Sequence, residues 1–155
     1  MAQSLSNVLL HLIYSTKNRE KFLAEKPLRN ELYAYMSSAL NSMGCNCIIA
    51  GGTSDHIHIL FVMSRTESIS DVVKHTKKET SKWIKTKSLD YNLLLNKFAW
   101  QSGYGVFSVS ASQRNTVISY IKSQEEHHEK ISFKEEFLAF LKKYEIKYNE
   151  KYLWD

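Results

Sequence analysis

Ser54-Asp55-His56-Ile57-His58-Ile59-Leu60 is the stretch around which the rest of this chain is organised. Its apolar and β-branched residues continue to Val62 and predict a β-strand. Because side chains alternate between the two faces of a strand, His56 and His58 are expected on the same face. The strand therefore presents two imidazoles together, and Asp55 precedes them as a hydrogen-bond acceptor that can orient one of them.

A second stretch, Tyr120-Ile121-Lys122-Ser123-Gln124, has the apolar spacing of a helix. The pattern predicts a helix over residues 112–128, capped by the serine at its start. Residues four apart lie on one side of a helix, about one turn from each other, so the phenol of Tyr120 is expected beside the amide of Gln124. At about 100° per residue, His127 shares the same flank.

We expect the fold to place this helical flank over the two histidines. His56 and His58 would then hold a metal ion with Gln124 as the third ligand, or with His127 in its place, and Tyr120 would lie at the edge of the site as a nucleophile. The plain structural alternative is that paired strand histidines, a boundary tyrosine and a surface amide have no shared role.

Two imidazoles and an amide oxygen form a mixed nitrogen and oxygen site that suits Mg²⁺ or Mn²⁺ together with water and a phosphate. Such an ion can polarise a scissile phosphate. A tyrosine nucleophile would retain the phosphodiester bond energy as a phosphotyrosine, which a free 3′-hydroxyl can later attack. This chemistry requires neither ATP nor an organic cofactor.

The composition fits a single compact domain over residues 1–155, with 43% hydrophobic and 24% charged residues. The net charge of +5 favours a polyanionic partner, nucleic acid before an anionic membrane surface. No apolar run approaches the roughly 20 residues of a membrane span, and Met1 to Leu5 carries no charged segment followed by a signal core. These features predict a cytoplasmic protein with no membrane partner.

The remaining periodic segments predict a mixture of strands and helices. Residues 6–15 are apolar on both faces, as in a central strand, and include His11, whose favoured interpretation is a hydrogen-bonded sheet histidine. The strand over 45–50 should pair with the histidine strand through Gly51 and Gly52, whose lack of side chains lets other groups approach. The other expected elements are helices over 28–43, 68–85 and 133–144 and strands over 98–101 and 104–110.

Basic side chains gather at two places. The helix over 68–85 has a lysine on its polar side at nearly every turn, and two more cations follow the first strand. Such a stripe can follow a sugar-phosphate backbone, because each ammonium that neutralises a phosphate releases a counterion; the alternative is an ordinary solvated helix face. The candidate DNA-binding residues are Lys17, Arg19, Lys74, Lys77, Lys78, Lys82 and Lys85.

Several stretches together resemble the single-tyrosine HUH transposases of the smallest bacterial insertion sequences, the IS200-like transposases, and their relatives associated with repetitive extragenic palindromes. They keep their order over nearly the whole chain, which makes the resemblance more specific than the histidine pair alone. The matching stretches are His11-Leu12-Ile13-Tyr14-Ser15-Thr16-Lys17, Gly51-Gly52 with Asp55-His56-Ile57-His58, Trp100-Gln101, Gly103 to Ser110, and Tyr120 to His128.

The resemblance implies an α+β fold, a ferredoxin-like sandwich in which helices pack on an antiparallel sheet. It assigns His56 and His58 as the metal pair, Gln124 as the third ligand and Tyr120 as the nucleophile. It also implies a partner, single-stranded DNA that carries a hairpin, which is cleaved to a 5′-phosphotyrosine and a free 3′-hydroxyl. A homodimer in which the tyrosine helix is exchanged is expected as well.

The helix and tail over about 133–155 are expected to belong to the single domain, with no added carboxyl-terminal region beyond this compact core. For this reason the insertion-sequence enzyme is preferred over the palindrome-associated relative. Two other functions stay open at this point. One is a catalytically inactive nucleic-acid binder, such as a repressor, on the same fold. The other is a metal-dependent phosphodiesterase that uses water as its nucleophile and leaves Tyr120 idle.

Overall fold

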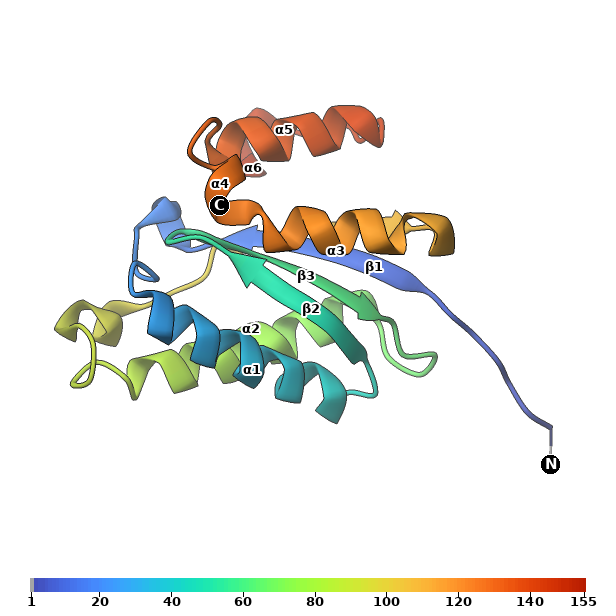
Figure 1. Ribbon diagram of the computed structural model, residues 1–155, viewed down its shortest axis with the longest axis horizontal. Coiled ribbons are helices and arrows are strands. Elements are labelled where there is room, and N and C mark those ends of the chain that lie inside the picture. The colour runs from blue at the N-terminus through green and yellow to red at the C-terminus, as the bar shows by residue number, and fades with distance from the viewer. Residues whose placement is uncertain (1) are drawn as a thin grey trace.

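The computed structural model describes residues 2–155 as an antiparallel sheet between two layers of helices (Figure 1). The strands are β1 (Leu9–Ser15), β2 (Asn46–Gly52), β3 (His56–Val62) and β4 (Gly105–Val109). The helices are α1 (Lys26–Ser42), α2 (Ile69–Lys85), α3 (Arg114–Lys122), α4 (Gln124–His127), α5 (Phe133–Lys143) and α6 (Glu150–Leu153). Short 3-10 helices are η1 (Lys17–Arg19), η2 (Leu93–Lys97) and η3 (Ala111–Gln113).

The four strands follow the order β2-β3-β1-β4, and every neighbouring pair is antiparallel. With α1 between β1 and β2 and α2 between β3 and β4, this is the ferredoxin-like arrangement. All residues of β1 are buried, because helices cover both faces of this central strand. The expected α+β fold with a ferredoxin-like sandwich is confirmed.

Helices α1 and α2 cover one face of the sheet (Figure 1). Leu12, Tyr14 and Ile59 point to that face and form the main core with apolar side chains of both helices. Ser68 caps the start of α2, since the backbone N–H of Asp71 donates to Ser68 Oγ at 3.1 Å. This layer therefore acts as the scaffold of the domain.

Helices α3 and α5 lie on the opposite face, above the strand that carries the histidines (Figure 1). Two glycines allow this close packing. A Cβ atom at Gly51 would lie 2.9 Å from the carbonyl oxygen of Ile121 in α3, and one at Gly105 would lie 2.6 Å from the ring of Phe137 in α5. The absence of side chains at these two positions therefore sets how closely both helices approach the sheet.

The single helix predicted over residues 112–128 is interrupted. Ser112 pairs with the hydroxyl of Ser110 instead of capping the helix, and α3 begins at Arg114. At Ser123 the backbone (φ −93°, ψ 14°) separates α3 from α4, and the Ser123 hydroxyl donates to the carbonyl of Ser119 at 2.9 Å. This local hydrogen bond competes with a regular helix and turns the chain before Gln124.

The strand predicted over residues 98–101 is also absent. Trp100 makes one isolated bridge with Thr16, while its indole N–H donates to Thr80 Oγ1 at 3.0 Å. The aromatic side chains at 98 and 100 are buried in the main core, and this packing, not strand pairing, holds the segment in place.

Within residues 2–155, none of the helices combines the length and apolar character that crossing a membrane requires. Met1, which begins the N-terminal segment considered above, lies outside the described residues.

Candidate metal and tyrosine site

His56 and His58 lie on the same face of β3, as the alternation predicts, and both side chains are fully buried. Their ring centroids are 5.2 Å apart. Helices α3, α4 and α5 enclose them on the face opposite to α1 and α2 (Figure 1). The pair therefore lies between the sheet and the second helical layer, shielded from bulk water.

His56 is oriented by the residues that precede it in the turn. Its Nδ1 lies 2.8 Å from Asp55 Oδ1 and 2.9 Å from Thr53 Oγ1. Burial acts to raise the pKa of Asp55, but the interactions with His56 and the hydrogen bond from Thr53 together lower it, so the carboxylate is ionised. This partner favours a proton on Nδ1, which leaves the Nε2 lone pair free 3.1 Å from Gln124 Oε1.

His58 has a partner at each ring nitrogen. Its Nδ1 lies 2.8 Å from His11 Nε2, and its Nε2 lies 2.9 Å from Glu136 Oε1. Burial lowers the pKa of His58 to about 4, despite the opposing effect of Glu136, and burial also lowers the pKa of His11. Both imidazoles are therefore neutral at pH 7, and His11, expected as a hydrogen-bonded sheet histidine, forms its bond within this site.

Glu136 is one of two side chains in this site that the sequence analysis did not propose; the other is His128. Glu136 projects from α5, is 2% exposed, and its carboxylate contacts the side chains of His58, His127, His128, Gln124 and Tyr120. Burial acts to raise its pKa, but the contacts with His128 and His58 prevail and hold the pKa well below its usual range. One signal was present in the sequence: this glutamate shares the apolar face of its helix with Phe133 and Phe140.

Four residues lie close enough together to hold one metal ion. His56, His58, His128 and Glu136 each offer one ligand atom, and these atoms lie within 4.8 Å of one another. His128 Nε2 is buried 3.1 Å from Glu136 Oε1, but it has no hydrogen-bond partner among residues 2–155. A cation between these atoms would satisfy this unpaired nitrogen, so the donor set fits a divalent ion.

Gln124 and His127, the two candidates for the third ligand, occupy different places. Gln124 is buried, and its Oε1 faces His56 Nε2, so it lies within reach of the same ion. His127 is only half-buried; its Nε2 lies 3.4 Å from Glu136 Oε2 and 3.3 Å from the Tyr120 hydroxyl. The geometry favours Gln124 and adds His128 and Glu136, which the sequence analysis did not propose.

Tyr120 lies beside the histidines of its own chain. Its ring centroid is 5.7 Å from that of His58, and its hydroxyl donates a hydrogen bond to Glu136. Burial, reinforced by Glu136, raises the pKa of Tyr120. The phenol is thus kept protonated in this arrangement, next to the atoms that can hold a cation. The exchange of this helix between two subunits remains a prediction.

The predicted DNA-binding residues of α2 lie elsewhere. Lys74, Lys78, Lys82 and Lys85 are exposed on α2, on the other face of the sheet from the histidines. Lys77 instead donates to the carbonyl oxygens of residues 101, 102 and 103 at 2.8 to 3.2 Å, and burial lowers its pKa to about 8. The lysine stripe is therefore not part of the metal site, and Lys77 holds a loop.

The two cations after β1 differ in exposure. Lys17 is exposed in η1, whereas Arg19 is half-buried with its guanidinium 5.7 Å from the ring centroid of Trp154. Arg19 thus packs against the C-terminal tail, while Lys17 faces solvent.

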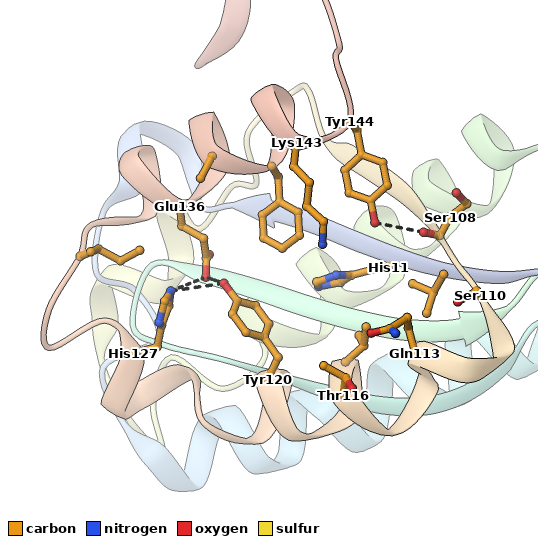
Figure 2. Close-up of a pocket in the computed structure, with 15 residues that line it drawn as sticks. His11, Ser108, Ser110, Gln113, Thr116, Tyr120, His127, Glu136, Lys143 and Tyr144 are labelled. Atoms are coloured by element: carbon orange, nitrogen blue, oxygen red, sulfur yellow. Dashed lines mark hydrogen bonds and ion pairs between the residues drawn. The ribbon is translucent and has the colours of Figure 1, made fainter.

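Two cavities adjoin the site. The larger, about 720 Å³, lies between α3 and α5, and Figure 2 shows Tyr120, His11 and Lys143 around it. The smaller, about 410 Å³, reaches Asp55 and His128 from the other side. The phenol of Tyr120 lines the larger cavity, so a substrate could reach it from there.

Known transposases resemble this chain in sequence pattern and in fold. A family model described as "Transposase IS200 like" matches residues 4–124. A crystal structure of a "putative transposase" from Deinococcus radiodurans R1 superimposes with a TM-score of 0.62 at 21% identity, covering 80% of this chain and 95% of its own. The structure of a REP-associated tyrosine transposase bound to a REP hairpin superimposes with a TM-score of 0.58 at 12% identity, covering 83% of this chain and 72% of its own. No curated protein matches the chain.

The fold and the match to the family model together define the class of this protein: it is a transposase, an enzyme that recombines DNA. This chain belongs to the IS200-like transposase family. The match includes His56, His58 and Tyr120 and ends at Gln124, so His128 and Glu136 lie beyond it.

Proposed function

We propose that this transposase cleaves and rejoins single-stranded DNA through a covalent bond between Tyr120 and a 5′-phosphate. The observation that carries the proposal is the position of the Tyr120 hydroxyl, which contacts the same carboxylate, Glu136, as His58. A nucleophile and a candidate metal site therefore share one buried polar network within a single chain.

The metal in this proposal is Mg²⁺ or Mn²⁺, held by His56 and His58 with Gln124, His128 or Glu136. Imidazole nitrogens suit Mn²⁺ better than Mg²⁺. When bound, such an ion polarises the scissile phosphate and stabilises the negative charge that develops on its oxygens.

The protein groups have distinct parts in the reaction. The Tyr120 oxygen attacks the phosphorus and loses its proton, the bond from phosphorus to the 3′-oxygen breaks, and that oxygen gains a proton. Asp55 and His11 hold the two imidazoles in place through their outer nitrogens. Rejoining is the reverse step, in which a 3′-hydroxyl attacks the phosphotyrosine and releases the phenol.

The partner in this proposal is single-stranded DNA with a hairpin at the end of the mobile element. A basic net charge of +5 and the fold shared with a REP-associated transposase bound to a REP hairpin support a DNA partner. A homodimer is part of the proposal too, although Tyr120 already lies beside the histidines of its own chain.

The test is a covalent-adduct assay on purified protein. Single-stranded hairpin oligonucleotides from the DNA flanking the gene, labelled at the 3′ end, are incubated with Mn²⁺ and separated under denaturing conditions. We expect a labelled protein band that disappears with EDTA and in Tyr120→Phe. Tyr148→Phe, at an exposed tyrosine, is the matched control and should keep the band.

Other results would support the other functions. Cut DNA without a protein adduct, unchanged by Tyr120→Phe, would indicate a metal-dependent phosphodiesterase. Bound but uncut DNA under all metal conditions would indicate a nucleic-acid-binding protein such as a repressor.

A further inference from the structure

The large cavity next to Tyr120 has the dimensions of a ligand site. Its volume is about 720 Å³, within the range of roughly 300 to 1,000 Å³ that small-molecule sites occupy. Tyr120 stands at one end and Tyr144 at the other, with α3 on one side and α5 on the other (Figure 2). A group attached to the Tyr120 oxygen would therefore have this space beside it.

The α5 side of the cavity ends in a fixed aromatic wall. The Tyr144 ring stacks on Phe107 with centroids 4.8 Å apart, and its hydroxyl donates to the carbonyl of Ser108 at 3.2 Å. Phe140 also stacks on Phe107, at 5.2 Å. Aromatic side chains that are already held in place can stack on a base with little further loss of conformational entropy.

Lys143 supplies a positive charge to the same space. Its ammonium group points into the cavity between His11 and Tyr144 (Figure 2). It lies 5.6 Å from the Tyr144 ring centroid, and it forms no ion pair with a carboxylate of residues 2–155. A lysine directed into a cavity without an acidic partner is available for an anionic group of a ligand.

We propose that this cavity binds the nucleotide whose 5′-phosphate is transferred to Tyr120. The base lies against Phe140 and Tyr144, and Lys143 contacts the phosphate backbone. This inference rests on the proposed function, since it takes Tyr120 as the attacking group. Phe140, Lys143 and Tyr144 come from α5 and the residue that follows it, beyond the part of the chain that the family model matches.

The shape of the site selects an unpaired base. A base that enters a cavity between two helices has left its stack and its partner strand, which costs least in single-stranded DNA. Gln113 and Ser110 line the wall opposite to α5 and can form hydrogen bonds with the edge of the base. The site therefore discriminates single-stranded from duplex DNA at the position of cleavage.

The test measures binding without chemistry. The probe is a 5′-phosphorylated trinucleotide with 2-aminopurine as its first base and thymine at the next two positions, added to the Tyr120→Phe protein. Stacking on Phe140 or Tyr144 should quench the fluorescence. We expect Lys143→Ala to weaken binding about tenfold, as for the loss of one charge-assisted contact. Lys142→Ala, the exposed neighbour, should stay within twofold.

A cavity-filling variant gives a second readout that does not depend on charge. Ala139 lines the cavity and is exposed, so Ala139→Trp should block the quenching, whereas Ala139→Ser should not. Thermal unfolding of each variant checks that the fold is kept. Equal quenching in Ala139→Trp, equal affinity in Lys143→Ala and Lys142→Ala, or equal quenching when 2-aminopurine occupies the third position would each overturn the proposal.

The two proposals fail in different ways. If the wild-type protein forms no adduct but the trinucleotide binds as described, the nucleotide site stands and the proposed reaction does not. If the adduct forms but the probe results are unchanged by Lys143→Ala and Ala139→Trp, the proposed reaction stands and the nucleotide lies elsewhere.

Discussion

The hydroxyl of Tyr120 donates a hydrogen bond to the carboxylate of Glu136, which lies 16 residues further along the chain. The other oxygen of that carboxylate lies 2.9 Å from His58 Nε2. One acidic side chain from α5 thus joins the tyrosine of α3 to a histidine of β3. The site is consequently built from three elements that only packing brings together.

We predict that Glu136→Gln weakens Mn²⁺ binding by about tenfold or more, because an anionic oxygen among buried imidazoles is replaced by a neutral amide. Isothermal titration of the metal-free protein measures the affinity. Glu135→Gln, one residue earlier and exposed, is the control. Unchanged or tighter binding in Glu136→Gln would mean that the carboxylate competes with the ion instead of holding it.

We predict different effects at two neighbouring histidines. His128→Ala should weaken Mn²⁺ binding, since its unpaired Nε2 faces the other candidate ligands. His127→Ala should leave the affinity nearly unchanged and slow adduct formation, because His127 contacts the Tyr120 hydroxyl. Metal titration and the adduct assay on both variants separate these effects, and the reverse pattern would assign His127 as the ligand.

The stability of the metal-free protein should depend on pH through His58. Burial lowers its pKa to about 4, whereas an exposed histidine has a pKa of 6.5, so the unfolded chain binds a proton here over the range between these values. The stabilising contribution of neutral His58 is therefore fully present above pH 6.5 and is lost as the pH falls toward 4. The difference between the folded-state and unfolded-state pKa of His58 corresponds to about 3 kcal/mol in the free energy of unfolding.

Urea unfolding at pH 7, 6, 5 and 4 measures this dependence. His58→Gln should reduce the loss of unfolding free energy as the pH falls, while His75→Gln, on α2, should leave it unchanged. His11, whose pKa is also lowered by burial, contributes in the same direction and keeps part of the slope. Parallel curves for the wild type and His58→Gln would contradict the prediction.

Gly51→Ala should destabilise the protein by about 1 to 3 kcal/mol and impair adduct formation. The added Cβ would lie 2.9 Å from the carbonyl oxygen of Ile121. To relieve this contact the backbone of α3 has to move, and that movement displaces Tyr120, the preceding residue. At Gly103, the nearest atom to an added Cβ is 3.4 Å away, so Gly103→Ala is the control. Urea unfolding measures the stability of both variants, and the adduct assay measures their activity.

The lysine stripe on α2 gives a prediction about DNA affinity. Lys78→Ala should weaken DNA binding and lower the salt slope of the affinity by about one, if this lysine contacts one phosphate. Fluorescence anisotropy with the hairpin oligonucleotide at several salt concentrations measures the slope. Lys97→Ala, an exposed lysine on η2, is the control. An unchanged slope would remove α2 from the DNA interface.

Much of the fold was predictable because local patterns report which faces of an element are buried. The apolar character of β1 on both faces predicted a central strand, and alternation predicted that His56 and His58 share a face. Helical spacing placed Tyr120 and Gln124 together, and Gly51 predicted a close backbone approach. Each of these properties depends on residues that are near one another in the sequence.

The sequence by itself determined the strand with its two imidazoles, the helix with its phenol and the family to which both belong. Only the tertiary structure decided that Glu136 and His128 join them, that Lys77 binds a loop and that the other α2 lysines face away from the site. The reason is physical: periodicity shows which side of an element is buried, but not which distant side chain meets it there. That depends on how closely α5 packs, and Gly105 sets this distance.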